Sequence, residues 1–156
     1  MLKTSIFDSF FAGHCLDAHN VFGAHFAYEG ISGVRFTVFA PNARNIQVIG
    51  TFNQWNGSDA FMKKISPQGV WSIFIANVNE WDLYKYLIEN AHGHWVEKSD
   101  PFAFYTEMRP KSSSLVVNLR NFGWTDKMWM NKRTKHLKEP MSIYEVHLGS
   151  WRKKYA

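Results

Sequence analysis

Short runs of alternating apolar and polar residues, each closed by turn-forming residues, constrain the fold of this chain most strongly. Alternation with a period of two places every second side chain on the same face of a β-strand. Val34, Phe36 and Val38 are one example, and we expect them to share a buried face. Helical periodicity is weak along the 156 residues. The pattern therefore predicts an all-β fold.

The turn signals divide the chain into several short predicted strands. A glycine-containing loop at residues 30–32 predicts a β-hairpin between two of them. The predicted strands lie at residues 23–29, 33–40, from 46, 71–75, 84–89, at Trp95 and 115–119. Short strands at this spacing within about a hundred residues are typical of an immunoglobulin-like β-sandwich.

Four segments are expected along the chain. The sandwich is predicted at residues 23–120, after an irregular N-terminal segment at residues 1–22. Residues 121–140 are polar, basic and without steady periodicity, which predicts an irregular linker. Residues 143–148 return to a strand pattern. We interpret residues 141–156 as the beginning of a further domain, of which this sequence holds only the first strand.

The distribution of charge and apolar residues limits the partners of the chain. The net charge is +5, but the basic residues cluster at 127–138 and 152–154, where a solvated connector explains them without nucleic acid. No window is apolar enough for a membrane span, and Lys3 and Asp8 interrupt any signal-peptide core. The single Cys15 is compatible with a reducing compartment. We expect a cytoplasmic protein with no nucleic-acid or membrane partner.

Candidate residues for catalysis and cofactors are few. Asp100 precedes a proline and is interpreted as a turn former, and Glu145 as part of a strand, so no acid and base pair is predicted. His92 and His94 could share a strand face but lack a third metal ligand at suitable spacing. No phosphate-binding glycine loop occurs. The sequence predicts no catalytic residue, no metal and no cofactor.

A sugar is the ligand that three other side chains suit best. Trp55 lies between Gln54 and Asn56, and a flat ring beside amide groups matches the C–H face and the hydroxyls of a sugar. Lys85 could donate to hydroxyls, and Trp95 follows a glycine turn. The alternatives are that both tryptophans fill the core and that Lys85 is an ordinary exposed strand lysine. The residues alone leave both interpretations open.

Several short motifs resemble a known family in their order along the chain. Residues 33–36, 40–43, 52–57 and 84–86 resemble the glycogen-binding type sandwich that precedes the catalytic barrels of α-amylase-family branching and debranching enzymes. Residues 98–104, 108–110 and 143–152 are similar to branching enzymes in particular. The resemblance runs from His25 to the end of the chain and includes Gly149-Ser150-Trp151.

The resemblance implies the non-catalytic N-terminal domain of a 1,4-α-glucan (glycogen) branching enzyme, which cleaves α-1,4 links and forms α-1,6 branches. It implies two partners, an α-glucan and the enzyme's own (β/α)8 barrel, which carries the catalytic carboxylates and needs about 250 residues. In glycogen-binding relatives, the positions matching Trp55, Lys85 and Trp95 contact the glucan. Relatives also have Thr and Asn where this chain has serines at 112–114. The chain itself is expected not to be an enzyme.

Three other functions remain open at this stage. The chain could be a stand-alone glucan-binding regulatory module, or the equivalent domain of a debranching or trehalose-forming enzyme. It could also be an immunoglobulin-like protein-interaction domain whose aromatic rings all lie in the core. Residues 144–151 favour the branching enzymes over the other enzymes and over a stand-alone module, which would need no barrel strand.

Overall fold

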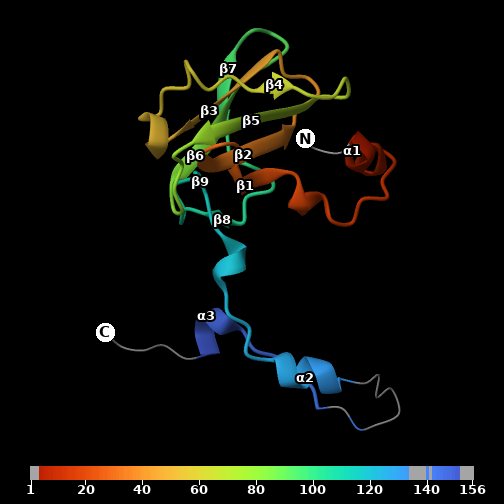
Figure 1. Ribbon diagram of the computed structural model, residues 1–156. Helices are drawn as coiled ribbons and strands as arrows, with labels where there is room; N and C mark the ends of the chain where they lie inside the picture. Colours follow the sequence, from red (N-terminus) through yellow and green to blue (C-terminus); the bar gives the residue numbers. More distant parts are fainter. Residues whose placement is uncertain (1–3, 134–139, 141, 152–156) are drawn as a thin grey trace. The chain divides into compact units, whose positions relative to one another are not determined.

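A computed structural model describes residues 4–133, 140 and 142–151. The chain divides into two compact units, Met1–Asn121 and Phe122–Ala156. The first unit is a sandwich of two antiparallel sheets (Figure 1). This confirms the predicted all-β, immunoglobulin-like sandwich.

Sheet A has four strands and sheet B has five. In sheet A the order is β1 (Gly23–Tyr28), β2 (Ser32–Phe39), β5 (Val70–Ala76) and β4 (Lys63–Lys64). In sheet B the order is β3 (Asn45–Gly50), β6 (Leu83–Glu89), β9 (Ser114–Leu115) and β8 (Tyr105–Thr106), and β7 (Trp95–Lys98) also pairs with β6. Three short 3-10 helices lie at Ala18–Asn20, Thr51–Asn53 and Leu119–Asn121.

The predicted hairpin and its buried face are both present. β1 and β2 pair antiparallel with Tyr28 opposite Ser32. Val34, Phe36 and Val38 point into the space between the sheets and are buried. The apolar alternation of β2 therefore decides which of its faces is covered by sheet B.

The main core lies between the two sheets. It is formed by residues from both sheets and from the segments between strands, and the principal members are Val34, Phe36, Ile46, Val48, Tyr84, Tyr86 and Val116. The rings of Phe36 and Tyr84 meet edge to face with centroids 5.0 Å apart, which joins sheet A to sheet B.

One carboxyl group lies inside this core. Asp100 accepts hydrogen bonds from the hydroxyls of Tyr84 at 2.7 Å and Tyr86 at 3.1 Å, and from the backbone N–H of Phe102 at 2.8 Å. The last bond closes a turn, which agrees with the predicted role of Asp100. Burial raises the pKa of the Asp100 carboxyl above its ordinary value, and these hydrogen bonds oppose the rise.

The N-terminal segment is partly helical, and the prediction of an irregular segment is wrong for this part. Helix α1 spans Thr4–Phe11 and lies beside the sandwich (Figure 1). Phe7 is buried with Phe22 and Val70, and the Phe10 and Phe11 rings contact Phe39 at 5.7 and 5.5 Å. Spacings of three and four residues put these rings on one helical face, and docking against sheet A stabilises a helix too short to persist alone.

The shortest strands differ most from the prediction. β4 and β8, with two residues each, were not predicted, and β9 ends at Leu115 although a strand was predicted over 115–119. Two residues cannot show alternation, so such strands leave no periodic signal in the sequence.

The second unit contains short helices among its described residues. Helix α2 spans Lys127–Lys132, within the linker predicted as irregular, and helix α3 spans Leu148–Trp151. The strand predicted at 143–148 is not formed. Residues 142–147 have no regular structure, and Leu148 begins α3. A strand needs a paired neighbour, and the described part of this unit offers none.

Some predictions fall outside the described residues. They concern residues 134–139 of the linker and residues 141 and 152–156 of the further domain. Of the helices within residues 4–133 and 142–151, none has the length and apolar character needed to cross a membrane.

Candidate functional site

The predicted sugar-contacting residues lie on or beside one face of sheet B, which we name the outer face. Along β6, Tyr84 and Tyr86 point into the core, so Lys85 and Glu89 point away from it. Trp95 on β7 is the register partner of Glu89 and shares its face. Lys85 and Trp95 are therefore on the same face, separated by about 13 Å along β6.

Trp95 belongs to an exposed aromatic pair. Its ring lies 6.4 Å from that of Phe61 in an edge-to-face arrangement, and the two side chains are 42% and 45% exposed. Phe61 bridges to Gln47 on the edge of β3 that faces away from β6. The backbones of Phe61 and Trp95 are therefore separated by β3 and β6, and the two rings meet above these strands. They form an apolar strip on the outer face.

Trp55 lies on the loop that follows β3. The Asn53 side chain holds this loop, since its oxygen accepts from the Gly50 N–H at 2.8 Å and its amide donates to the Val48 carbonyl at 2.9 Å. The Trp55 N–H donates to the Gly50 carbonyl at 2.8 Å. Trp55 is 40% exposed and has a positive φ of 62°. The tight turn thus presents much of its ring to solvent.

The loop that carries Trp55 packs against the outer face. A Cβ on Gly57 would lie 2.6 Å from the Gln47 side-chain oxygen and 2.9 Å from a methyl carbon of Ile49, both on β3. Only a glycine allows this close approach. Ile49 is buried although it points away from the core between the sheets, and it is the register partner of Lys85. The close packing therefore sets the Trp55 loop next to the Lys85 end of β6.

Lys85 forms an ion pair across the outer face. Its ammonium lies 2.9 Å from a carboxylate oxygen of Glu97 on β7, and its side chain is 19% exposed. The pair places a fixed donor and a fixed acceptor between the two tryptophans along the sheet. Stacking surfaces flanked by such groups suit the apolar faces and the hydroxyls of sugars.

The serines at 112–114 do not all reach this surface. Ser113 and Ser114 are buried, and the Ser114 hydroxyl accepts from the Asp100 backbone N–H at 2.9 Å. Ser112 is exposed. In this chain the hydroxyl of Ser114 therefore belongs to the core, beside Tyr84 and Tyr86.

In the part of the chain that the structure describes, no three His, Cys, Asp or Glu residues are grouped to hold a metal ion. The carboxyl with the raised pKa, that of Asp100, lies in the core and not on this face. The groups that this face does present, exposed rings beside the Lys85–Glu97 ion pair, suit stacking and hydrogen bonding.

Comparison with known families gives this face its context. Residues 21–103 match carbohydrate-binding module 48, the isoamylase N-terminal domain. The chain belongs to the carbohydrate-binding module 48 family. The matched region contains Trp55, Lys85 and Trp95, and it ends before the second unit.

Individual relatives extend the similarity. The chain is 44% identical over 150 residues to the 1,4-alpha-glucan branching enzyme GlgB of Bacillus cytotoxicus and 42% identical to that of Bacillus mycoides. Each match covers 94% of this chain and 23% of the relative, so the chain spans about a quarter of their length. These matches confirm the resemblance to branching enzymes that the sequence motifs indicated.

Solved structures share the fold of the first unit. PulA from Klebsiella oxytoca superposes with a TM-score of 0.53 and 26% identity, covering 67% of this chain and 10% of PulA. A Klebsiella pneumoniae pullulanase complexed with maltotriose superposes with a TM-score of 0.53, 23% identity and the same coverage. At this identity the similarity shows the fold alone.

Sequence reasoning missed Phe61, which forms the exposed aromatic pair with Trp95 on this face. Phe61 lies between the buried residues Ala60 and Met62, so its exposure follows the same alternation as a strand. The signal is present in the sequence, but three residues next to a two-residue strand are too short a window to identify it. Its pairing with Trp95 depends on the fold and has no local signal.

Proposed function

We propose that this chain is the non-catalytic, glucan-binding region of a 1,4-α-glucan branching enzyme. In this proposal the outer face of sheet B binds an α-glucan, with Trp55 and Trp95 stacking on sugar rings and Lys85 donating to hydroxyls. The observation that carries it is the presence of two half-exposed tryptophans and a fixed ammonium beside one sheet face, inside a carbohydrate-binding module.

The names of the relatives support the enzyme class. The Bacillus proteins are 1,4-alpha-glucan branching enzymes, and the similarity covers 94% of this chain, well beyond the module at residues 21–103. We propose that the parent enzyme transfers α-1,4-glucan segments to form α-1,6 branches through carboxylates on a barrel that is not part of this chain. The module would pack against that barrel and orient long glucan chains in the cytoplasm, with no role for nucleic acid or membrane.

Glycogen co-sedimentation tests the binding site. Replacing Trp55 or Trp95 with Ala should weaken retention about tenfold, because each replacement removes a stacking surface. Lys85→Ala should weaken it less, since its donor already bonds to Glu97. Trp124→Ala is the matched control, because Trp124 is exposed and lies in the second unit. Failure of the unmutated chain to bind glycogen would favour a protein-interaction domain.

A branching assay tests the non-catalytic part of the proposal. The purified chain incubated with amylose should produce no α-1,6 linkages, as measured by the anomeric proton signals of the product. New α-1,6 signals above a heat-treated control would show that the chain is itself an enzyme.

A further inference from the structure

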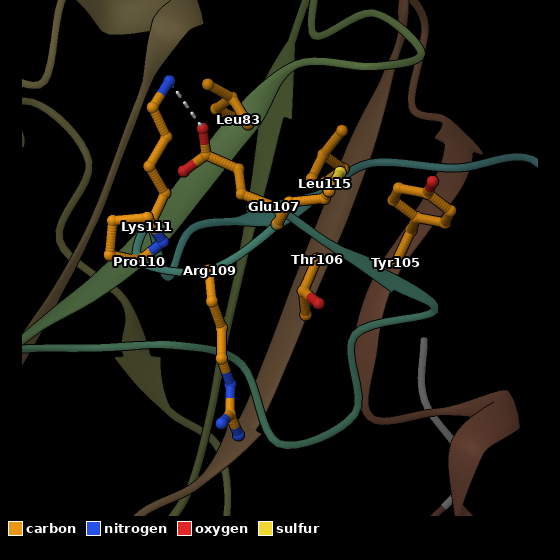
Figure 2. A pocket seen from close by; sticks show the side chains of 9 residues that line it. Leu83, Tyr105, Thr106, Glu107, Arg109, Pro110, Lys111 and Leu115 are labelled. Atoms are coloured by element: carbon orange, nitrogen blue, oxygen red, sulfur yellow. Dashed lines mark ion pairs between the residues drawn. The ribbon is translucent and has the colours of Figure 1, made fainter. Parts of the chain in front are cut away.

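We infer that the outer face of sheet B carries a second α-glucan subsite, formed by Trp81 and Tyr105 and separate from Trp55, Lys85 and Trp95. This inference rests on the proposed function, because it extends the same binding face. It assigns a ligand to the groove beside Tyr105 shown in Figure 2.

Trp81 and Tyr105 form an exposed aromatic corner. Trp81 precedes β6 and Tyr105 begins β8, and their rings meet edge to face at 5.9 Å with an interplanar angle of 88°. The side chains are 57% and 55% exposed. Two large rings held at a right angle and open to solvent offer one sugar two apolar contacts.

The backbone at Trp81 is strained in the same way as the backbone at Trp55. Among the described residues, four other than glycine have a positive φ, namely Gln54, Trp55, Asn77 and Trp81. Such a conformation costs a bulky residue on the order of 1 kcal/mol or more, and strained residues of this kind cluster at functional sites, including ligand-binding ones. Neither tryptophan is buried, so burial does not offset this cost.

Hydrogen bonds fix Trp81 in this conformation. The Trp81 N–H donates to the Val116 carbonyl at 2.7 Å. The carboxylate of the next residue, Asp82, accepts from the Asn79 N–H at 2.7 Å and from the Thr51 hydroxyl at 2.6 Å. Thr51 begins the loop that carries Trp55. The hydrogen bond between Thr51 and Asp82 therefore links the loop that carries Trp55 to the loop that carries Trp81.

The groove beside Tyr105 has an apolar floor on the outer face. Leu83, Leu115 and Tyr105 are register partners across β6, β9 and β8, and they share the face of Lys85. Figure 2 shows the Tyr105 ring beside Leu115. The cavity has a volume of about 420 Å³. A floor of this kind accepts the C–H face of a sugar.

Polar groups border this floor. Glu107 pairs with Lys111 at 3.5 Å and accepts from the Ser113 N–H at 3.2 Å, while the Arg109 side chain points away from this pair (Figure 2). The hydrogen bonding from Ser113 lowers the pKa of the Glu107 carboxyl, which keeps it a charged acceptor. Donors and an acceptor around an apolar floor suit the equatorial hydroxyls of glucose units.

The two subsites lie within reach of one polymer. Leu83 is two residues from Lys85 on the same face, about 7 Å along β6, and Tyr105 is two strands away, about 10 Å. One α-glucan chain can therefore occupy both subsites, and the second contact is then intramolecular. This continuity of one face is why we assign a glucan to the groove.

Tryptophan side-chain NMR tests the inference on the full chain. The seven indole N–H signals are followed during titration with maltoheptaose, and Trp81→Phe assigns one of them. The Trp81 signal should shift in the unmutated chain and should still shift in Trp55→Ala. In co-sedimentation, Trp81→Ala and Tyr105→Ala should each weaken glycogen binding about fivefold to tenfold, with Tyr28→Ala as the exposed control on sheet A.

The outcomes separate this inference from the proposed function. If the Trp55 and Trp95 signals shift and the Trp81 signal does not, the second subsite is wrong and the proposed function stands. If no indole signal shifts, both are wrong. If Trp81→Ala weakens binding while the Trp81 signal stays constant, the effect is structural and the second subsite is again overturned.

Discussion

At the scale of single residues, Asp100 shows how a polar group is accommodated in this core. Its carboxylate accepts hydrogen bonds from the hydroxyls of Tyr84 and Tyr86. Among the described residues, no buried side-chain polar atom lacks a hydrogen-bond partner. The arrangement joins the segment after β7 to the centre of β6. Its stability consequences follow from the cost of leaving buried hydroxyls unpaired.

Replacing Asp100 with Ala should lower the free energy of unfolding by about 2–4 kcal/mol, because two buried hydroxyls lose their acceptor. Urea denaturation followed by tryptophan fluorescence measures this change. Asp59→Ala, at an exposed position, should change it by less than about 0.5 kcal/mol. Equal unfolding midpoints for the two variants would contradict the role given to Asp100.

The stability contribution of Asp100 should also depend on pH. Burial raises the pKa of Asp100 in the folded state, so the folded chain holds this proton more tightly than the unfolded chain does. Stability relative to Asp100→Asn should therefore fall as the pH rises from about 3.9, the unfolded pKa, through the folded pKa. Urea midpoints of both proteins between pH 3 and 7 test the sign. A difference that grows with pH would contradict it.

The candidate residues differ in how well the sequence reveals them. Trp55 can be found because Gln54 and Asn56 flank it in a polar loop, and Trp81 carries a similar local signal because it lies between Glu80 and Asp82. Tyr105 cannot be found this way. Its place on the outer face depends on pairing with Leu115, and that contact exists only in the folded sheet.

At the scale of elements, α1 owes its helix to the sheet beneath it. Eight residues are too few for a stable isolated helix in water. The contacts of Phe7 with Phe22, and of Phe10 and Phe11 with Phe39, supply the missing stability. We therefore expect α1 to form and dissolve together with its docking.

Phe7→Ala should undock α1, because the loss of a buried phenylalanine costs about 3 kcal/mol. Hydrogen exchange should then increase over Thr4–Phe11 while β2 and β6 keep their protection. Leu16→Ala, at a position that is 96% exposed, should leave both regions unchanged. Faster exchange in β6 as well would show that α1 and the sandwich unfold as one unit.

The elements that were predicted correctly are those with long alternating patterns. β2 and β6 are seven or more residues long, and their alternating pattern identifies which residues face the core. The helix α1 was missed because two turns give a weak helical period. The strand at 143–148 was predicted from a genuine alternating pattern, but a strand also requires a neighbour, which the local sequence does not supply.

At the scale of the whole molecule, the chain consists of two units with different organisation. The sandwich and both of its apolar clusters lie in Met1–Asn121. The described residues of the second unit contain short helices and several exposed aromatic side chains, among them Trp124, Tyr144 and Trp151. The core of the first unit is complete without them.

A chain that ends at Asn121 should therefore keep the stability of the sandwich. We expect its unfolding free energy to lie within about 0.5 kcal/mol of that of the full chain, and its glycogen binding to be unchanged. Urea denaturation and co-sedimentation of the two proteins test this. A lower midpoint for the shorter chain would show that residues 122–156 stabilise the sandwich.

The hydrogen bond between Thr51 and Asp82 has a consequence for ligand choice. Because it links the loop that carries Trp55 to the loop that carries Trp81, it limits how far the two rings can move relative to each other. A polysaccharide that bends with a different pitch meets one ring and misses the other. In the proposed two-subsite face, a coiled glucan would therefore contact both rings and a straight glucan only one.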